Sequence, residues 1–257
     1  MGNTLQDYTF KRPQMGNFLL TIGILLGGAS VGNAQTEPTT YYADAVQLAA
    51  RAAQDLNESA QISLDMVAEL TIALEAIANS GLVTAELVTK ELNIHAFTYA
   101  NTNSVQVYAD VNAPWVQKLL DDKNNLDKSP LKTFVQFHDL TLSHIKNLDG
   151  IMMLTLQSKA PKNMKYIAND ISFLDDVIMV ELPAKNGDGH DIKAKRISGG
   201  WIISYIYKYE DCLSGCKKQC EWQFGVDYNN HVQFLGLYGQ IPDKINSTPV
   251  VVMQNNN

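Results

Sequence analysis

The chain has 257 residues, of which 46% are hydrophobic and 18% are charged. This apolar content is enough for one or two packed domains, and it excludes a disordered, collagen-like or fibrous chain. Lys and Arg number 20 against 27 Asp and Glu, so the formal net charge is -7. An acidic chain lacks the basic surface that nucleic-acid binding requires, so we expect no nucleic-acid partner. The sequence by itself does not disclose a biochemical activity.

Residues 1–34 have the organisation of a secretory signal peptide. Lys11 and Arg12 precede an apolar run over residues 18–26, and small residues follow it as far as Ala34. A basic start, a short apolar run and small residues before a cleavage site are typical of such signals. The run is much shorter than the roughly 20 residues that span a bilayer, so a retained anchor is the weaker alternative. We expect cleavage near Ala34 and a secreted or periplasmic mature chain without a membrane span.

Residues 35–93 are predicted to form a helical segment. Residues 41–79 contain no Gly or Pro, and Asn79 to Gly81 is a typical helix stop. Thr84 is a candidate cap for a second, short helix that ends at Leu92. We interpret the segment as a helical hairpin packed on the following domain; the alternative is an oligomerisation or partner-binding helix. The apolar residues that recur at helical spacing are Ile62, Met66, Leu70, Ala73 and Ile77.

Residues 94–183 are predicted to form a ferredoxin-like α+β domain. Two strand–helix–strand units follow one another, which favours a βαββαβ sheet with helices on one face and parallel strands within each unit. Residues 139–150 fit this plan less well and favour a short helix. The expected strands are 105–109, 133–138, 151–157 and 177–182, and the expected helices begin at Pro114 and Met164.

Residues 184–242 are predicted to form an antiparallel β-meander, and residues 243–257 a flexible tail. Asn229-Asn230 is a turn signal between two strands of alternating polarity. A two-residue loop there pairs Phe224 with Leu235, and a three-residue loop pairs it with Phe234. The whole chain is thus predicted to be α+β. The aromatic residues proposed as possible partner contacts, with a core position as the alternative, are Trp201, Tyr205, Tyr207, Trp222 and Phe224.

Three cysteines, Cys212, Cys216 and Cys220, lie between two aromatic strands of the meander. Export to an oxidising compartment favours a disulfide, and the Ser214-Gly215 turn can bring Cys212 and Cys216 within bonding distance. We predict this pair, with Cys220 as a buried thiol on the apolar face. The alternatives are a bond from Cys220 to Cys216 or to another chain.

The pattern D-C-x-S-G-C at 211–216, followed by Trp222-x-Phe224, resembles a C-terminal region of uncharacterised exported bacterial proteins. The resemblance covers residues 150–240. It implies a two-cysteine loop in an exported, β-rich domain and implies no reaction. Cys220 departs from the usual two-cysteine pattern.

The sequence predicts no metal site and no cofactor. C-x3-C-x3-C does not have the spacing of structural zinc sites, and no C-x-x-C redox pair occurs. The oxygen-rich segment 186–191 lacks the order of an EF-hand calcium loop, so an ordinary turn is favoured there. The five histidines form no ligand pair, and no phosphate-binding loop or nucleophile elbow is present.

The leading functional hypothesis is therefore a non-enzymatic exported protein, a binding or structural module for an unknown protein or glycan. The alternative is a hydrolase of an extracytoplasmic substrate that uses Asp188, His190 or Asp191. A third hypothesis, an inhibitor similar in shape to the prodomains of subtilisin-like proteases, rests on fold analogy alone.

Overall fold

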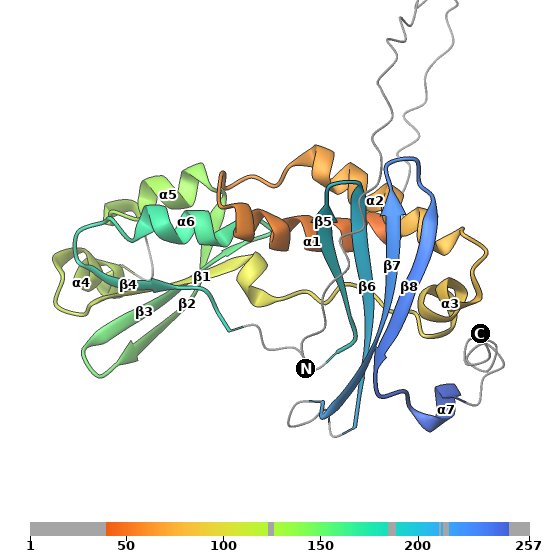
Figure 1. The fold of residues 1–257 in the computed structure, drawn as a ribbon. Coiled ribbons are helices and arrows are strands. Elements are labelled where there is room, and N and C mark those ends of the chain that lie inside the picture. The colour runs from red at the N-terminus through yellow and green to blue at the C-terminus, as the bar shows by residue number, and fades with distance from the viewer. Residues whose placement is uncertain (1–39, 123–125, 185–188, 211, 213–215, 247–257) are drawn as a thin grey trace, which may run out of the picture.

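The computed structural model describes residues 40–122, 126–184, 189–210, 212 and 216–246. These residues form two four-stranded sheets with helices packed against them, so the chain is α+β as predicted (Figure 1). The predicted signal peptide and residues 247–257 of the predicted tail lie outside the described residues.

The first sheet has the strand order β2-β3-β1-β4, and every neighbouring pair is antiparallel. Its chain order is strand, two helices, strand, strand, helix, strand, and the second strand lies at 140–148 and not at the predicted 133–138. The ferredoxin-like assignment stays a prediction. Strands β3 and β4 run in the same direction with β1 between them. The elements are β1 (Ser104–Asp110), α4 (Pro114–Asp121), α5 (Lys132–Phe137), β2 (Leu140–Leu148), β3 (Ile151–Ser158), α6 (Met164–Ile171) and β4 (Val177–Glu181).

Two predictions within this sheet are wrong. The expected strand at 133–138 is helix α5, because Phe134 and Val135, half-buried on one side of a helix, pack against the core beside the buried cap residue Leu131. Residues 139–150, where we expected a short helix, form strand β2 and the turn into β3. Asp149 and Gly150 have positive φ values of 48° and 95°, which suit a two-residue hairpin turn.

The second sheet is the predicted antiparallel meander, in the order β5-β6-β7-β8. Phe224 pairs with Phe234, but Trp222 pairs with Leu237, because a bulge separates them and leaves Leu235 without a cross-strand partner. The Phe224–Phe234 pair has the register of a three-residue loop, and the Trp222–Leu237 pair, beyond the bulge, has the register that a two-residue loop would give. The strands are β5 (Asp191–Ile197), β6 (Gly200–Tyr209), β7 (Lys218–Asp227) and β8 (Val232–Gly239).

The N-terminal helices form a hairpin that differs from the predicted one, because the helix is interrupted at residues 57–63 between α1 and α2, where a single helix to Asn79 was expected. They pack mainly on the second sheet, and α1 also contacts α6 of the domain that follows them in the chain. Ser63 caps α2, since its hydroxyl accepts a hydrogen bond from the amide of Met66 at 3.3 Å. Thr84 is not a cap: Leu82 occupies that position, and Thr84 is buried within α3. The helices are α1 (Thr40–Leu56), α2 (Leu64–Ala78), α3 (Val83–Glu86), a π-helical turn (Leu87–Glu91) and, near the C-terminus, α7 (Asp243–Asn246).

Two hydrophobic cores follow from this arrangement. One lies between α1–α3 and the second sheet, and the other lies between the first sheet and α4–α6. Residues 40–92 and 191–245 therefore share one core, although the whole first sheet lies between them in the chain. The sequence pattern predicts two separate units there, because no local signal links segments so far apart in the chain.

The proposed aromatic contact surface is largely core. Trp201, Tyr205, Trp222 and Phe224 are each no more than 4% exposed and face α1 and α2. Tyr207 is half-buried, and its ring stacks on that of His190 with centroids 4.1 Å apart. Because four of the five side chains are covered, they do not offer a surface to a partner.

The cysteines have the predicted arrangement. Cys212 and Cys216 are disulfide-bonded with their Cα atoms 4.0 Å apart, and Cys220 is a buried free thiol.

In the described part of the chain no single helix is long and apolar enough to cross a membrane. Only α2 and the helical residues 83–91 pass that test together, as a pair bent by 112°.

Candidate ligand-binding site

A cavity of about 490 Å³ lies between helix α1 and strand β5, the edge strand of the second sheet. Its volume is within the range of roughly 300–1,000 Å³ that is usual for small-molecule sites. Its apolar wall consists of Leu48, Ala52, Leu56, Met66, Ala194 and Trp201. Its charged residues are Arg51, Asp55, Asp191, Lys193, Lys195 and Arg196, and Tyr99 completes the lining.

Helix α1 supplies five of the lining residues from a single face. Leu48, Arg51, Ala52, Asp55 and Leu56 follow the spacing i, i+3, i+4, i+7, i+8. This is the spacing of neighbours along one side of a helix. The face is apolar in its middle and charged at intervals, and Leu56 at its end is 56% exposed.

Strand β5 presents unpaired backbone groups to the cavity. It pairs with β6 on one side and has no strand partner on the other among the described residues. The amide of Ile192 donates to Asp191, and its carbonyl accepts from Arg51 at 2.7 Å, so both groups point away from β6. In an antiparallel pair alternate residues point the same way, so the backbone groups of Ala194 and Arg196 also face this edge.

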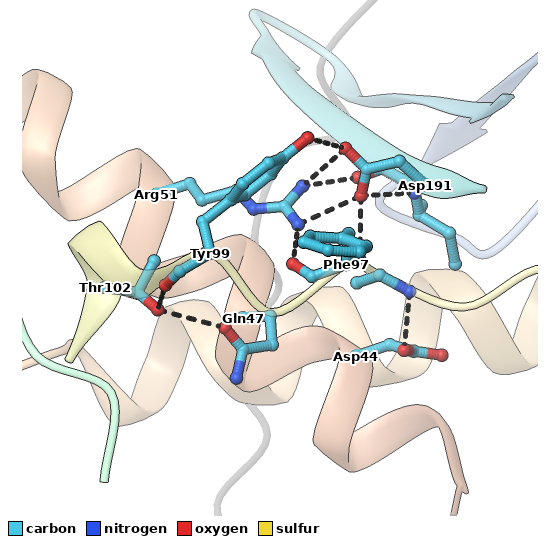
Figure 2. A network of polar contacts seen from close by, with 9 residues as sticks. Asp44, Gln47, Arg51, Phe97, Tyr99, Thr102 and Asp191 are labelled. Atoms are coloured by element: carbon cyan, nitrogen blue, oxygen red, sulfur yellow. Dashed lines mark hydrogen bonds and ion pairs between the residues drawn. The ribbon is translucent and has the colours of Figure 1, made fainter. Parts of the chain in front are cut away.

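The floor of the cavity is an ion pair between Arg51 and Asp191 (Figure 2). One carboxylate oxygen of Asp191 accepts from Arg51 Nη2 at 2.9 Å and from the amides of Phe97 and Ile192 at 2.8 and 2.9 Å. The other accepts from Arg51 Nη1 at 3.3 Å and from the Tyr99 hydroxyl at 2.9 Å. Asp191 is 1% exposed, so these five contacts compensate a buried charge.

Arg51 joins three parts of the chain at this point. Besides Asp191 and Ile192 on β5, it donates through Nη2 to the carbonyl oxygen of Phe97. Its guanidinium also lies over the Tyr99 ring, 4.6 Å from the centroid. Burial, followed by the charge of Asp191, raises the pKa of Tyr99 to about 12, so its hydroxyl is a donor at neutral pH.

The cations on the other side of the cavity are less constrained. Lys193 and Lys195 are exposed and have no hydrogen-bond or ion-pair partner among the described residues. Arg196 pairs with Glu69 at 3.0 Å and lies over the Trp201 ring at 5.5 Å. Lysines on an edge strand also prevent strands of two copies from pairing, which is a purely structural reason for their presence.

Two buried hydrogen-bond donors beside the cavity lack a partner within the described residues: Trp201 Nε1 and Arg51 Nε. Most buried donors in folded proteins are satisfied by protein or by ordered water. Both residues line the cavity, so its walls contain unused donor capacity in addition to the exposed lysines.

The residues proposed for hydrolysis do not form a catalytic group. Asp188 lies outside the described residues. His190 stacks on Tyr207, and its Nδ1 accepts from the amide of Lys208 at 3.2 Å. Burial, followed by the charge of Lys208, lowers the pKa of His190. Asp191 is engaged by the contacts described above, so its carboxylate serves to hold the structure together.

A second hollow of about 530 Å³ lies between the end of α2 and the β7–β8 hairpin. Its lining includes Glu75, Asn79, Asn230 and His231, and it is more open to solvent than the α1–β5 cavity. The α1–β5 cavity is therefore the better candidate site.

Across the described parts of the chain, no group of three or more His, Cys, Asp or Glu side chains could hold a metal ion.

Comparisons with protein-family models, with curated proteins and with solved structures find no match for this chain. The resemblance of residues 150–240 to uncharacterised exported bacterial proteins stays a prediction. Sequence reasoning did not identify the cavity. The signal that could have found half of it is the five-residue face of α1, in a segment rich in alanine.

Proposed function

We propose that this chain is an exported binding protein that holds a small, partly apolar molecule in the cavity between α1 and β5. The observation that carries the proposal is the cavity itself, a concave space in which an apolar wall of six residues is bordered by six charged residues from α1 and β5. Such a combination is the usual form of a small-molecule site.

A binding role is favoured over catalysis by the state of the polar groups. Asp191, the most buried acid at the cavity, has both carboxylate oxygens occupied by structural contacts. A general base or nucleophile needs an oxygen that is available to the substrate. No contact among the described residues favours the hydrolase hypothesis, and none favours a protease-prodomain role or identifies a protein or glycan partner.

Export is supported by two features. Residues 1–34 have the signal-peptide organisation described above, and Cys212 and Cys216 are disulfide-bonded, which is typical of oxidising compartments. The mass of the product recovered from an exporting host tests this part of the proposal. We expect a chain that begins at Gln35; a full-length product inside the cell would contradict export.

Binding is tested by calorimetry with three probes of equal chain length: decanol, decanoate and decylammonium. We expect at least one to bind the purified protein. Ala52→Phe fills the cavity from α1 and should abolish binding, whereas Leu64→Phe, at a position 77% exposed and outside the cavity, should not. The proposal is wrong if none of the probes binds, or if Ala52→Phe, shown to be folded, binds them as well as the unmodified chain.

A further inference from the structure

We infer that the ligand of the α1–β5 cavity is an anionic amphiphile, with its apolar chain against α1 and its anionic group at the free edge of β5. This inference rests on the proposed function and adds the chemical class of the ligand. It depends on the charge of the cavity wall, on the backbone groups of β5 and on the apolar face of α1.

The charge of the wall is opposite to that of the protein. The chain carries a net charge of -7, yet four cations and two acids line the cavity. Arg51 compensates Asp191, and Arg196 is paired with Glu69 outside the lining. Among the described lining residues this leaves Lys193, Lys195 and Asp55 without an ion-pair partner, and the two lysines border the cavity from the edge of β5, on the strand face opposite Ala194. Their excess of positive charge attracts an anion to this part of an acidic protein.

The edge of β5 adds directional donors to this charge. The amides of Ala194 and Arg196 point toward the cavity side, between and beside the two lysines. A carboxylate or a similar oxyanion accepts hydrogen bonds from backbone amides and ammonium groups together, and such charge-assisted bonds are the stronger kind.

The apolar part of the ligand has a matching surface on α1. Leu48, Ala52 and Leu56 form a continuous strip, with Met66 of α2 beside it. Leu56 is 56% exposed, so a chain lying along the strip would remove apolar surface from water. Methionine adapts its shape to apolar ligands more readily than branched side chains do.

A peptide strand added to β5 would use the same edge, but the structure gives it little length. The Arg51 guanidinium already occupies the carbonyl of Ile192, and β5 ends at Ile197. Only Ala194 and Arg196 then have free edge groups in this strand, whereas a strand addition normally forms a longer ladder. A compact amphiphile therefore fits the site better than a peptide.

The decisive experiment compares decanoate and decylammonium, each below its micelle concentration, with decanol, below its solubility limit, by calorimetry on the purified protein. We expect decanoate to bind about ten- to a hundredfold more tightly than decanol, the factor for hydrogen bonds to a charged group, and decylammonium to bind most weakly. Since the lysines are exposed, the preference should shrink as salt is added.

Paired substitutions assign the preference to β5. Lys193→Gln with Lys195→Gln should reduce the preference for decanoate over decanol several-fold, with the remainder due to the backbone amides of β5, and leave decanol binding unchanged. The matched control, Lys146→Gln with Lys165→Gln, removes two exposed lysines associated with the other sheet and should retain the preference. If the β5 lysines only protect an edge strand, the first variant would aggregate more readily and its preference would be unchanged.

The results of these binding measurements distinguish a failure of the inferred ligand class from a failure of the proposed binding function. Equal binding of decanol and decanoate, abolished by Ala52→Phe, would overturn the anionic class and keep the binding proposal. Tighter binding of an acidic peptide than of decanoate would overturn the amphiphile class. The absence of any cavity-dependent binding would overturn both.

Discussion

Arg51 on α1 and Asp191 at the start of β5 are 140 residues apart in the chain, yet their side chains meet at 2.9 Å in a largely buried ion pair. The pair joins the N-terminal helices to the C-terminal sheet. Phe97 and Tyr99, in the segment that leads into the first sheet, contact both partners. It also forms the floor of the cavity, so the stability of this core and the shape of the site depend on the same contact.

Replacing Asp191 by Asn should strongly destabilise the protein. The substitution keeps the shape of the side chain but leaves the Arg51 charge, 16% exposed, without its counter-ion. Breaking a buried pair in this way costs about 3–5 kcal/mol. Urea unfolding measures the change. The control is Glu86→Gln in the exposed pair with Lys90, for which we expect less than about 1 kcal/mol. Equal losses in the two variants would show that the Arg51–Asp191 pair has no special role.

The contribution of Tyr99 should depend on pH in the alkaline range. Its folded-state pKa is raised, first by burial and then by Asp191, from 10.0 to about 12. The protonated form is thus favoured by folding, so this stabilisation is complete below the unfolded value of 10.0 and is lost as the pH rises through about 12. We expect the difference in unfolding free energy between the unmodified chain and Tyr99→Phe to shrink over this interval.

Tyr228→Phe is the control for the alkaline series, because Tyr228 is 51% exposed and lies in the β7–β8 turn. The difference in unfolding free energy between Tyr228→Phe and the unmodified chain should stay constant over the same alkaline range. Parallel pH profiles for the unmodified chain and Tyr99→Phe would contradict the contact with Asp191.

Gly200, the first residue of β6, should tolerate no side chain. Its φ is +149°, and an added Cβ would lie 2.0 Å from the carbonyl oxygen of Val226 on β7. Gly81 also has a positive φ, +71°, but a Cβ there meets nothing within 4 Å. We expect Gly81→Ala to cost about 1–2 kcal/mol through backbone strain alone, and Gly200→Ala to cost more because β6 and β7 must separate. Thermal unfolding of both variants tests the order; a smaller loss at Gly200 would contradict it.

Elements with a strong local pattern were predicted from the sequence. Apolar residues that recur at helical spacing from Met66 to Ile77 identified α2. The alternation from Cys220 to Tyr228 identified β7 for the same reason, and Asn229-Asn230 identified its turn. In contrast, Thr133 to Phe137 is aromatic and β-branched and still forms helix α5, because its packing against the core overrides the intrinsic preference.

The site was not predictable, for two physical reasons. The cavity face of α1 alternates apolar Leu48, Ala52 and Leu56 with charged Arg51 and Asp55, so the sequence does not distinguish a ligand-lining face from an ordinary half-solvated helix face. The Arg51–Asp191 pair depends on how the helices and the second sheet come together around an intervening sheet. A single sequence carries no signal for a contact of that separation.

The thiol chemistry of the chain should be divided between an accessible disulfide and an inert cysteine. Burial raises the pKa of Cys220 to about 12, so its reactive thiolate is scarce at neutral pH, and its side chain is fully buried beneath the helices. Cys212 and Cys216 are partly exposed.

We expect iodoacetamide to label no cysteine in the native protein and Cys220 alone in denaturant. After reduction of the folded protein, it should label Cys212 and Cys216 but not Cys220. Intact-mass analysis with peptide mapping measures each state. Native labelling of Cys220, or a mapped bond that includes it, would contradict the arrangement, because a fully buried sulfur on β7 can be reached only if the core around it opens.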